Sequence, residues 1–154
     1  MNTENGWKPL PTSLKILFVI FGLGVLSSIY SLFSVSEGGY SLFSFELYGL
    51  SAILLLLLIS IVGSSVILLG FWKRYSWVWK YTLGYLIFMI LNGILSMLNL
   101  SSKVSLIVSQ LEISIPGFDQ ILYIILVVSI ILSILINLWF LIIVYRNDKY
   151  FLQN

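Results

Sequence analysis

Residues 52–72 read AILLLLLISIVGSSVILLGFW and contain no charged side chain. An α-helix needs about 20 predominantly apolar residues to cross the hydrocarbon core of a bilayer. This stretch therefore predicts a transmembrane helix, which its flanking residues extend to about 46–72. Three further apolar stretches, at about 14–35, 78–100 and 119–145, predict three more spans.

The composition agrees with a chain that is solvated mainly by lipid. Hydrophobic residues make up 60% of the sequence and charged residues only 9%, whereas a soluble domain is typically about 25% charged. We expect one all-α transmembrane domain over residues 1–154, folded as a polytopic four-helix bundle.

The alternative for the first span is a signal peptide ending at Ser34-Val35-Ser36. Its apolar stretch is longer than the usual 7–15 residues, so we expect an uncleaved span.

The distribution of lysine and arginine predicts the orientation of the spans. Seven of the eight basic residues fall on one side of a four-span topology: in the flank before the first span, in the turn between the second and third spans, and in the flank after the fourth span. The other side holds only Lys103. Short loops rich in Lys and Arg face the cytoplasm. The sequence therefore predicts a multi-pass protein of the cell membrane with both termini cytoplasmic.

Aromatic residues gather around the basic turn between the second and third spans. Amphipathic rings prefer the headgroup level of a bilayer, so this cluster predicts an anchoring belt. The alternative is a site for an anionic lipid headgroup, because basic clusters beside a span attract such lipids. The residues of this predicted cytoplasmic interface are Trp72, Lys73, Arg74, Trp77, Trp79, Lys80 and Arg146.

The longest predicted external connection carries a second amphipathic pattern. Val104, Ile107, Val108 and Leu111 follow i, i+3, i+4, i+7 spacing, with polar residues between them. This spacing predicts a short helix over about 103–113 that lies at the outer interface. The alternative is a frayed extension of the third span.

The two halves of the chain resemble each other. An offset of 65 residues places the first span on the third, and an offset of 73 places the second span on the fourth. These offsets superpose Ser31 on Ser96 and Ser64 on Asn137. We therefore predict two similar helical hairpins related by a pseudo-two-fold axis along the membrane normal, as in parallel-repeat transporters.

Polar residues recur on single faces of the predicted spans. Because polar groups facing lipid lack hydrogen-bond partners, we expect these stripes to turn inward. Their routine role is helix packing, and the alternative is a small polar cavity open to the outside. The predicted stripe comprises Ser27, Ser31, Ser34, Ser60, Ser64, Asn92, Ser96, Asn99, Ser133 and Asn137.

Two carboxylates flank the spans at the predicted outer mouth. Glu46 and Asp119 are each expected at the start of a helix, where unpaired N–H groups and the helix dipole favour a negative charge. The alternative is attraction of a cation or contact with a ligand. No ionisable residue is predicted at mid-membrane, which argues against proton pumps and voltage sensors.

Cysteine and histidine are both absent from the chain. Thiolate nucleophiles, disulfides and the usual zinc, haem and iron–sulfur ligand sets are therefore excluded. The sequence also contains no phosphate-binding loop and no nucleophile elbow. We expect no enzymatic activity and no cofactor, and the small net charge of +2 gives no sign of nucleic-acid binding.

The segment Gly70-Phe-Trp-Lys-Arg-Tyr-Ser-Trp-Val-Trp-Lys80 resembles an element of small, uncharacterised four-span membrane proteins of bacteria and archaea. In those proteins a span ends in glycine and an aromatic residue, and a basic turn leads into a Trp-rich span. The resemblance implies the four-span layout and transfers no activity and no site residues.

These observations favour a non-enzymatic accessory or scaffold subunit of a larger membrane complex or homo-oligomer. Its expected partners are membrane lipids and other membrane subunits or further copies of the chain. The alternative is a small transporter, channel or lipid-binding bundle with an outward-facing polar cavity. Between residues 16 and 25 and between 66 and 71 the spans carry no polar side chain, which argues against an ion conduit.

Overall fold

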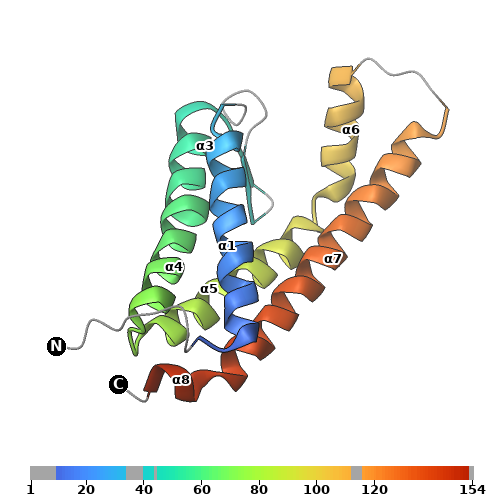
Figure 1. Ribbon diagram of the computed structural model, residues 1–154. Coiled ribbons are helices and arrows are strands. Elements are labelled where there is room, and N and C mark those ends of the chain that lie inside the picture. The colour runs from blue at the N-terminus through green and yellow to red at the C-terminus, as the bar shows by residue number, and fades with distance from the viewer. Residues whose placement is uncertain (1–9, 34–39, 44, 112–115, 153–154) are drawn as a thin grey trace.

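The computed structural model describes residues 10–33, 40–43, 45–111 and 116–152, and the chain is mostly helical (Figure 1). The elements are α1 (Thr12–Ser31), β1 (Tyr40–Leu42), β2 (Phe45–Leu47), α3 (Gly49–Leu55), the π-helix η1 (Leu56–Val62), α4 (Gly63–Lys73), α5 (Val78–Ser96), α6 (Leu100–Leu111), α7 (Phe118–Arg146) and α8 (Asp148–Leu152).

Four helices in the described part of the chain are long and apolar enough to cross a membrane. They are α1, the continuous helix Gly49–Lys73 formed by α3, η1 and α4, α5, and α7. The protein is therefore membrane-embedded. The first and third helices end a few residues earlier than the sequence predicts, and the second begins three residues later, at Gly49 rather than residue 46.

Consecutive spans pair with each other. α1 packs mainly against η1 and α4, and α5 packs mainly against α7, with the α4–α5 contact joining the two pairs. We call the end that carries the start of α1, the α4–α5 turn and α8 the turn end. The opposite end, with the two strands and α6, is the hairpin end (Figure 1).

The β1–β2 hairpin is the main departure from the predicted organisation. β1 and β2 pair antiparallel with Leu42 opposite Phe45, so Phe43 lies in the loop between the strands. Glu46 therefore lies in a strand, and the prediction that it begins a helix was wrong. The second span begins only after Tyr48, whose backbone is extended, and Gly49, whose φ is +59°.

The helix expected over about 103–113 corresponds in position to α6, Leu100–Leu111; residues 112 and 113 lie outside the described part of the chain. α6 packs against α7. The turn Met97–Asn99 separates α6 from α5, so α6 is a separate helix and not a continuation of the third span.

The hydrophobic core lies at the turn end. Its buried members are contributed by the residue Leu10 just before α1, the first half of α1, the second half of α4, the first half of α5, the end of α7 and α8. They are Leu10, Leu14, Leu17, Phe21, Ile67, Phe71, Val78, Leu86, Phe140, Val144 and Phe151. Among the described residues, the hairpin end has the small cluster of Ala52 and Leu56 and the buried α6 side chains Leu100 and Val104. Most of the buried hydrophobic side chains therefore lie at the turn end.

Candidate functional site

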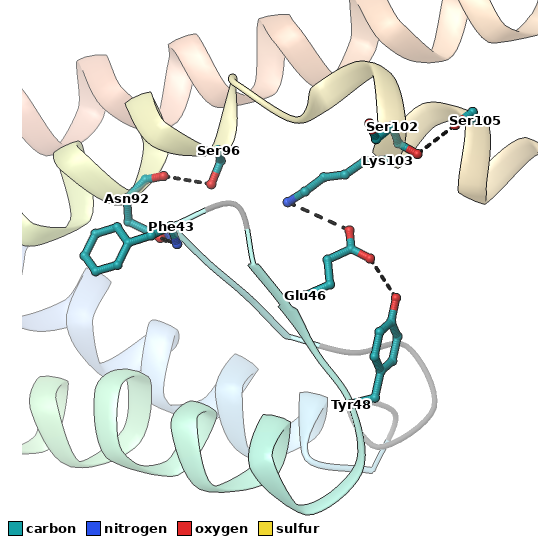
Figure 2. A network of polar contacts seen from close by, with 8 residues as sticks. All are labelled: Phe43, Glu46, Tyr48, Asn92, Ser96, Ser102, Lys103 and Ser105. Carbon is teal, nitrogen blue, oxygen red and sulfur yellow. Dashed lines mark hydrogen bonds and ion pairs between the residues drawn. The ribbon is translucent and has the colours of Figure 1, made fainter.

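The hairpin end carries the network of polar contacts drawn in Figure 2. The backbone N–H of Phe43 donates a hydrogen bond to Asn92 Oδ1 on α5 at 2.6 Å. On the same hairpin, Glu46 accepts a 2.6 Å hydrogen bond from the Tyr48 hydroxyl. The other oxygen of Glu46 lies 4.0 Å from Lys103 Nζ on α6. The hairpin is therefore tied by side chains to both α5 and α6.

Phe43 occupies a strained backbone conformation. Its φ is +47°, a left-handed value that costs a bulky residue about 1–3 kcal/mol. The Asn92 hydrogen bond holds its backbone, and its ring packs edge-on against Phe88 of α5 with centroids 5.2 Å apart. Such strain persists only where the surroundings over-determine the conformation, so α5 fixes the hairpin loop.

The Glu46–Tyr48 contact changes the acidity of the phenol. The hydrogen bond to Glu46 and its negative charge, together with some desolvation, raise the pKa of Tyr48 above its ordinary value of 10.0. The phenol therefore remains a hydrogen-bond donor throughout the physiological range. Sequence reasoning did not single out Phe43, Tyr48 or Lys103 in this role, because nothing before folding places the hairpin beside α5 and α6.

The predicted polar residues of α1 and α5 lie toward the hairpin end. Ser31 donates to the Ser27 carbonyl at 3.0 Å, and Ser96 donates to the Asn92 carbonyl at 2.7 Å. Ser31 and Ser96 are half-buried, whereas Ser27 and Asn99 are exposed. The hydroxyls of Ser31 and Ser96 thus bond their own helices one turn back. Ser34 lies outside the described residues.

In the second span Ser60 is half-buried and Ser64 is buried. Ser64 Oγ lies 3.3 Å from the Tyr85 hydroxyl of α5, a hydrogen bond that joins the two halves of the molecule. Gly63 allows this approach, because a Cβ at that position would lie 2.8 Å from the Tyr85 ring.

The predicted stripe on α7 lies on a poorly covered helix. The only buried residues of α7 are Phe140 and Val144, at its turn end. Ser129 and Ser133 are exposed and Asn137 is half-exposed. Ser129 donates to the Ile125 carbonyl and Asn137 Nδ2 donates to the Ser133 carbonyl, each at 2.8 Å. Among the described residues, Asn137 Oδ1 accepts no hydrogen bond.

A cavity of about 510 Å³ lies between α6 and the start of α7. Ser101, Asp119, Gln120 and Tyr123 supply polar groups to its lining, and Val104 and Ile124 supply apolar ones. Asp119 lies in the first turn of α7, and Tyr123 follows it one helical turn later. The sequence pointed to Asp119, but the cavity itself depends on how α6 packs.

The basic and aromatic residues of the turn end lie in and around the α4–α5 turn. Arg74, with φ +53°, ends α4, and its guanidinium lies 5.0 Å from the Tyr150 ring of α8. Burial raises the pKa of Tyr150, and the Arg74 charge opposes that rise. Trp72, Lys73, Trp77, Lys80 and Arg146 are exposed.

Trp79 differs from the other tryptophans of this cluster. Its side chain is partly buried and packs against the core of the turn end. Its ring lies 5.7 Å from Lys80 Nζ, and its buried Nε1 has no hydrogen-bond partner among the described residues. Trp79 therefore packs against the core of the turn end and also contacts a basic residue of the surface cluster.

Within the described part of the chain, no three Asp or Glu side chains come together as a metal-ligand group. The chemistry available at the hairpin end is hydrogen bonding, ion pairing and van der Waals contact from Asn92, Glu46, Lys103 and Asp119.

Comparison with known proteins gave no match to a family model, a curated protein or a solved structure.

Proposed function

We propose that this protein is a non-enzymatic accessory or scaffold subunit of the cell membrane that associates laterally through α7, with another membrane subunit or with a second copy. The observation that carries this proposal is the placement of the Asn137 amide. It lies on a poorly covered helix with Oδ1 unpaired among the described residues.

The position of Asn137 along α7 makes that amide costly in lipid alone. It is nine residues from Arg146, about 13.5 Å along the helix axis at 1.5 Å per residue, and thus within the apolar span. Polar groups in hydrocarbon without partners are unfavourable. A neighbouring transmembrane helix supplies such partners, and small polar residues such as Ser129 and Ser133 allow its close approach.

The proposal includes an orientation with the turn end in the cytoplasm. The described basic residues Lys15, Lys73, Arg74, Lys80, Arg146 and Lys149 belong to the elements of that end. The hairpin end carries Glu46 and Asp119 and the basic residue Lys103. Positive charge on the turn end supports its cytoplasmic placement, with the exposed tryptophans Trp72 and Trp77 in the adjacent interface.

We also propose that the two halves derive from one duplicated helical hairpin with a pseudo-two-fold axis along the membrane normal. The pairing of α1 with η1 and α4, and of α5 with α7, supports this proposal. So does the equivalence of Ser31 and Ser96, whose hydroxyls bond carbonyls four residues earlier at matched positions. The insertions at the hairpin end differ, with two strands in the first half and α6 in the second.

The packed core of the turn end supports a subunit over an ion conduit. Phe71, Val78 and Val144 are fully buried there, and buried Thr82 donates its hydroxyl to the Val78 carbonyl of its own helix. A charge at the bilayer centre costs at least about 2.5–3.5 kcal/mol. We therefore expect the pure protein in liposomes to conduct no ions above background.

Gentle extraction from native membranes followed by native mass spectrometry tests the subunit proposal. The wild-type chain of 17.5 kDa should appear in a stoichiometric assembly, either with a second protein or at an integer multiple of its own mass. The variant S133L/N137L should release the 17.5 kDa chain, whereas the control S27L, an exposed serine on α1, should retain the assembly. A wild-type chain that is always a lone monomer would contradict the proposal.

A further inference from the structure

We propose that the cavity between α6 and α7 binds an amphiphilic monocation, with an amine head beside Asp119 and a hydrocarbon body along α6. This inference is independent of the subunit function, because it concerns the hairpin end and not the segment of α7 around Ser133 and Asn137. The cavity volume of about 510 Å³ falls within the 300–1,000 Å³ typical of small-molecule sites.

The charge of the lining selects a cation. Asp119 carries the one carboxylate among the described lining residues, and within the described part of the chain that carboxylate makes no hydrogen bond or ion pair. The basic residue nearest in α6 is Lys103, which extends toward the hairpin and lies 4.0 Å from Glu46 (Figure 2). Lys103 is therefore directed to a different carboxylate and does not neutralise Asp119.

The groups around Asp119 suit an amine head. Tyr123 follows Asp119 by four residues and so lies on the same helix face, and both line the cavity. Gln120 and Ser101 add carbonyl and hydroxyl acceptors. A cation near a carboxylate and an aromatic face gains from both the ionic and the cation–π interaction.

The remaining lining suits a hydrocarbon body. Val104 on α6 is 5% exposed, whereas Ile124 on α7 is 60% exposed. Most of the lining surface is apolar, and the cavity is open to its surroundings. A hydrocarbon tail can therefore lie against Val104 and Ile124 and leave toward the surrounding lipid. An anionic or purely polar ligand would match neither the charge nor this surface.

The test uses the full chain in nanodiscs of zwitterionic lipid, titrated calorimetrically with octylammonium at neutral pH. The neutral analogue 1-octanol and the anionic analogue octanoate match its chain length, and empty nanodiscs give the lipid background. The wild-type protein should bind the cation about fivefold to tenfold more tightly than octanol, as an exposed ion pair together with a cation–π contact suggests.

The variants assign that preference to the cavity. D119N should remove the preference for the cation while leaving octanol binding unchanged, which also shows that the cavity is intact. The control D148N, in α8 at the turn end, should behave as wild type. Y123L should weaken cation binding, and Y123F should restore it. Equal affinity for cation and octanol, an unaltered preference in D119N, or no binding above empty nanodiscs would each overturn the proposal.

Discussion

Asn92 on α5 accepts a 2.6 Å hydrogen bond from the backbone N–H of Phe43, which precedes it by 49 residues in the sequence. This contact links the loop of the β1–β2 hairpin to the third span. It also stabilises the left-handed conformation of Phe43, which is disfavoured for a bulky side chain. The connection between the first two spans is therefore positioned by the second half of the chain.

Replacing Asn92 with leucine should loosen the hairpin without unfolding the spans. The lost hydrogen bond predicts a destabilisation of about 0.5–1.5 kcal/mol. Hydrogen exchange of the backbone amides in residues 40–47 should become faster, while that of α4 stays unchanged. The control Asn99→Leu alters an exposed amide and should leave hairpin exchange as in wild type. Unchanged hairpin exchange in Asn92→Leu would show that the contact does not hold the loop.

Tyr48 should ionise at a higher pH than an ordinary tyrosine. Its pKa is raised above 10.0, first by the hydrogen bond to Glu46. Because the folded pKa is raised, its contribution to stability is complete below the unfolded pKa and is lost as pH rises through the folded value. Subtracting the ultraviolet titration of Tyr48→Phe from that of wild type isolates this residue. Glu46→Gln should bring the midpoint back toward 10.0; no downward change would argue against the contact.

The four spans could be predicted from apolar length alone, because a bilayer sets the number of residues needed to cross it. The hairpin could not be predicted in this way, because a glutamate such as Glu46 before an apolar run is also typical of the start of a helix. Phe43, Phe45 and Leu47 are compatible with strands, but a short apolar stretch does not decide between helix and strand. The π-helix Leu56–Val62 also left no signal in a nearly uniform run of leucine and isoleucine.

The candidate site could be predicted only in part from the sequence, for a related reason. Asp119 and Asn92 stand out in apolar surroundings, so composition alone points to them. Their partners depend on tertiary packing: Asn92 meets a backbone N–H of the hairpin, and Asp119 lines a cavity formed with α6. The polar stripe gave no indication that the hydroxyls of Ser31 and Ser96 donate to carbonyls of their own helices.

Gly70→Ala should destabilise the turn end. A Cβ at Gly70 would lie 2.7 Å from Val78 Cβ and still closer to Val78 Cγ2. Overpacking of this kind typically costs about 1–3 kcal/mol, which should lower the thermal midpoint in detergent. The control Gly84→Ala meets no atom within 4 Å and should be neutral or slightly stabilising. Gly70→Ala/Val78→Ala should recover part of the loss; equal behaviour of the two single variants would contradict the close approach.

Single cysteines should report the orientation without background, because the natural chain contains none. Ser76→Cys, in the exposed α4–α5 turn, should react in intact cells only with membrane-permeant maleimides. Ser102→Cys, exposed on α6, should react with impermeant maleimides as well. The reverse labelling pattern would place the turn end outside the cell.

Site-specific photo-crosslinking on α7 in native membranes tests the central claim of lateral association most directly. Adjacent positions provide the comparison: Ser133 is exposed, whereas Ile134 faces α5, where a Cβ on Gly93 would lie 3.0 Å from its Cγ1. A photoreactive residue at 133 should give one discrete product with a second protein or a second copy, and one at 134 should crosslink within the chain. Only lipid adducts or diffuse products from position 133 would contradict the account.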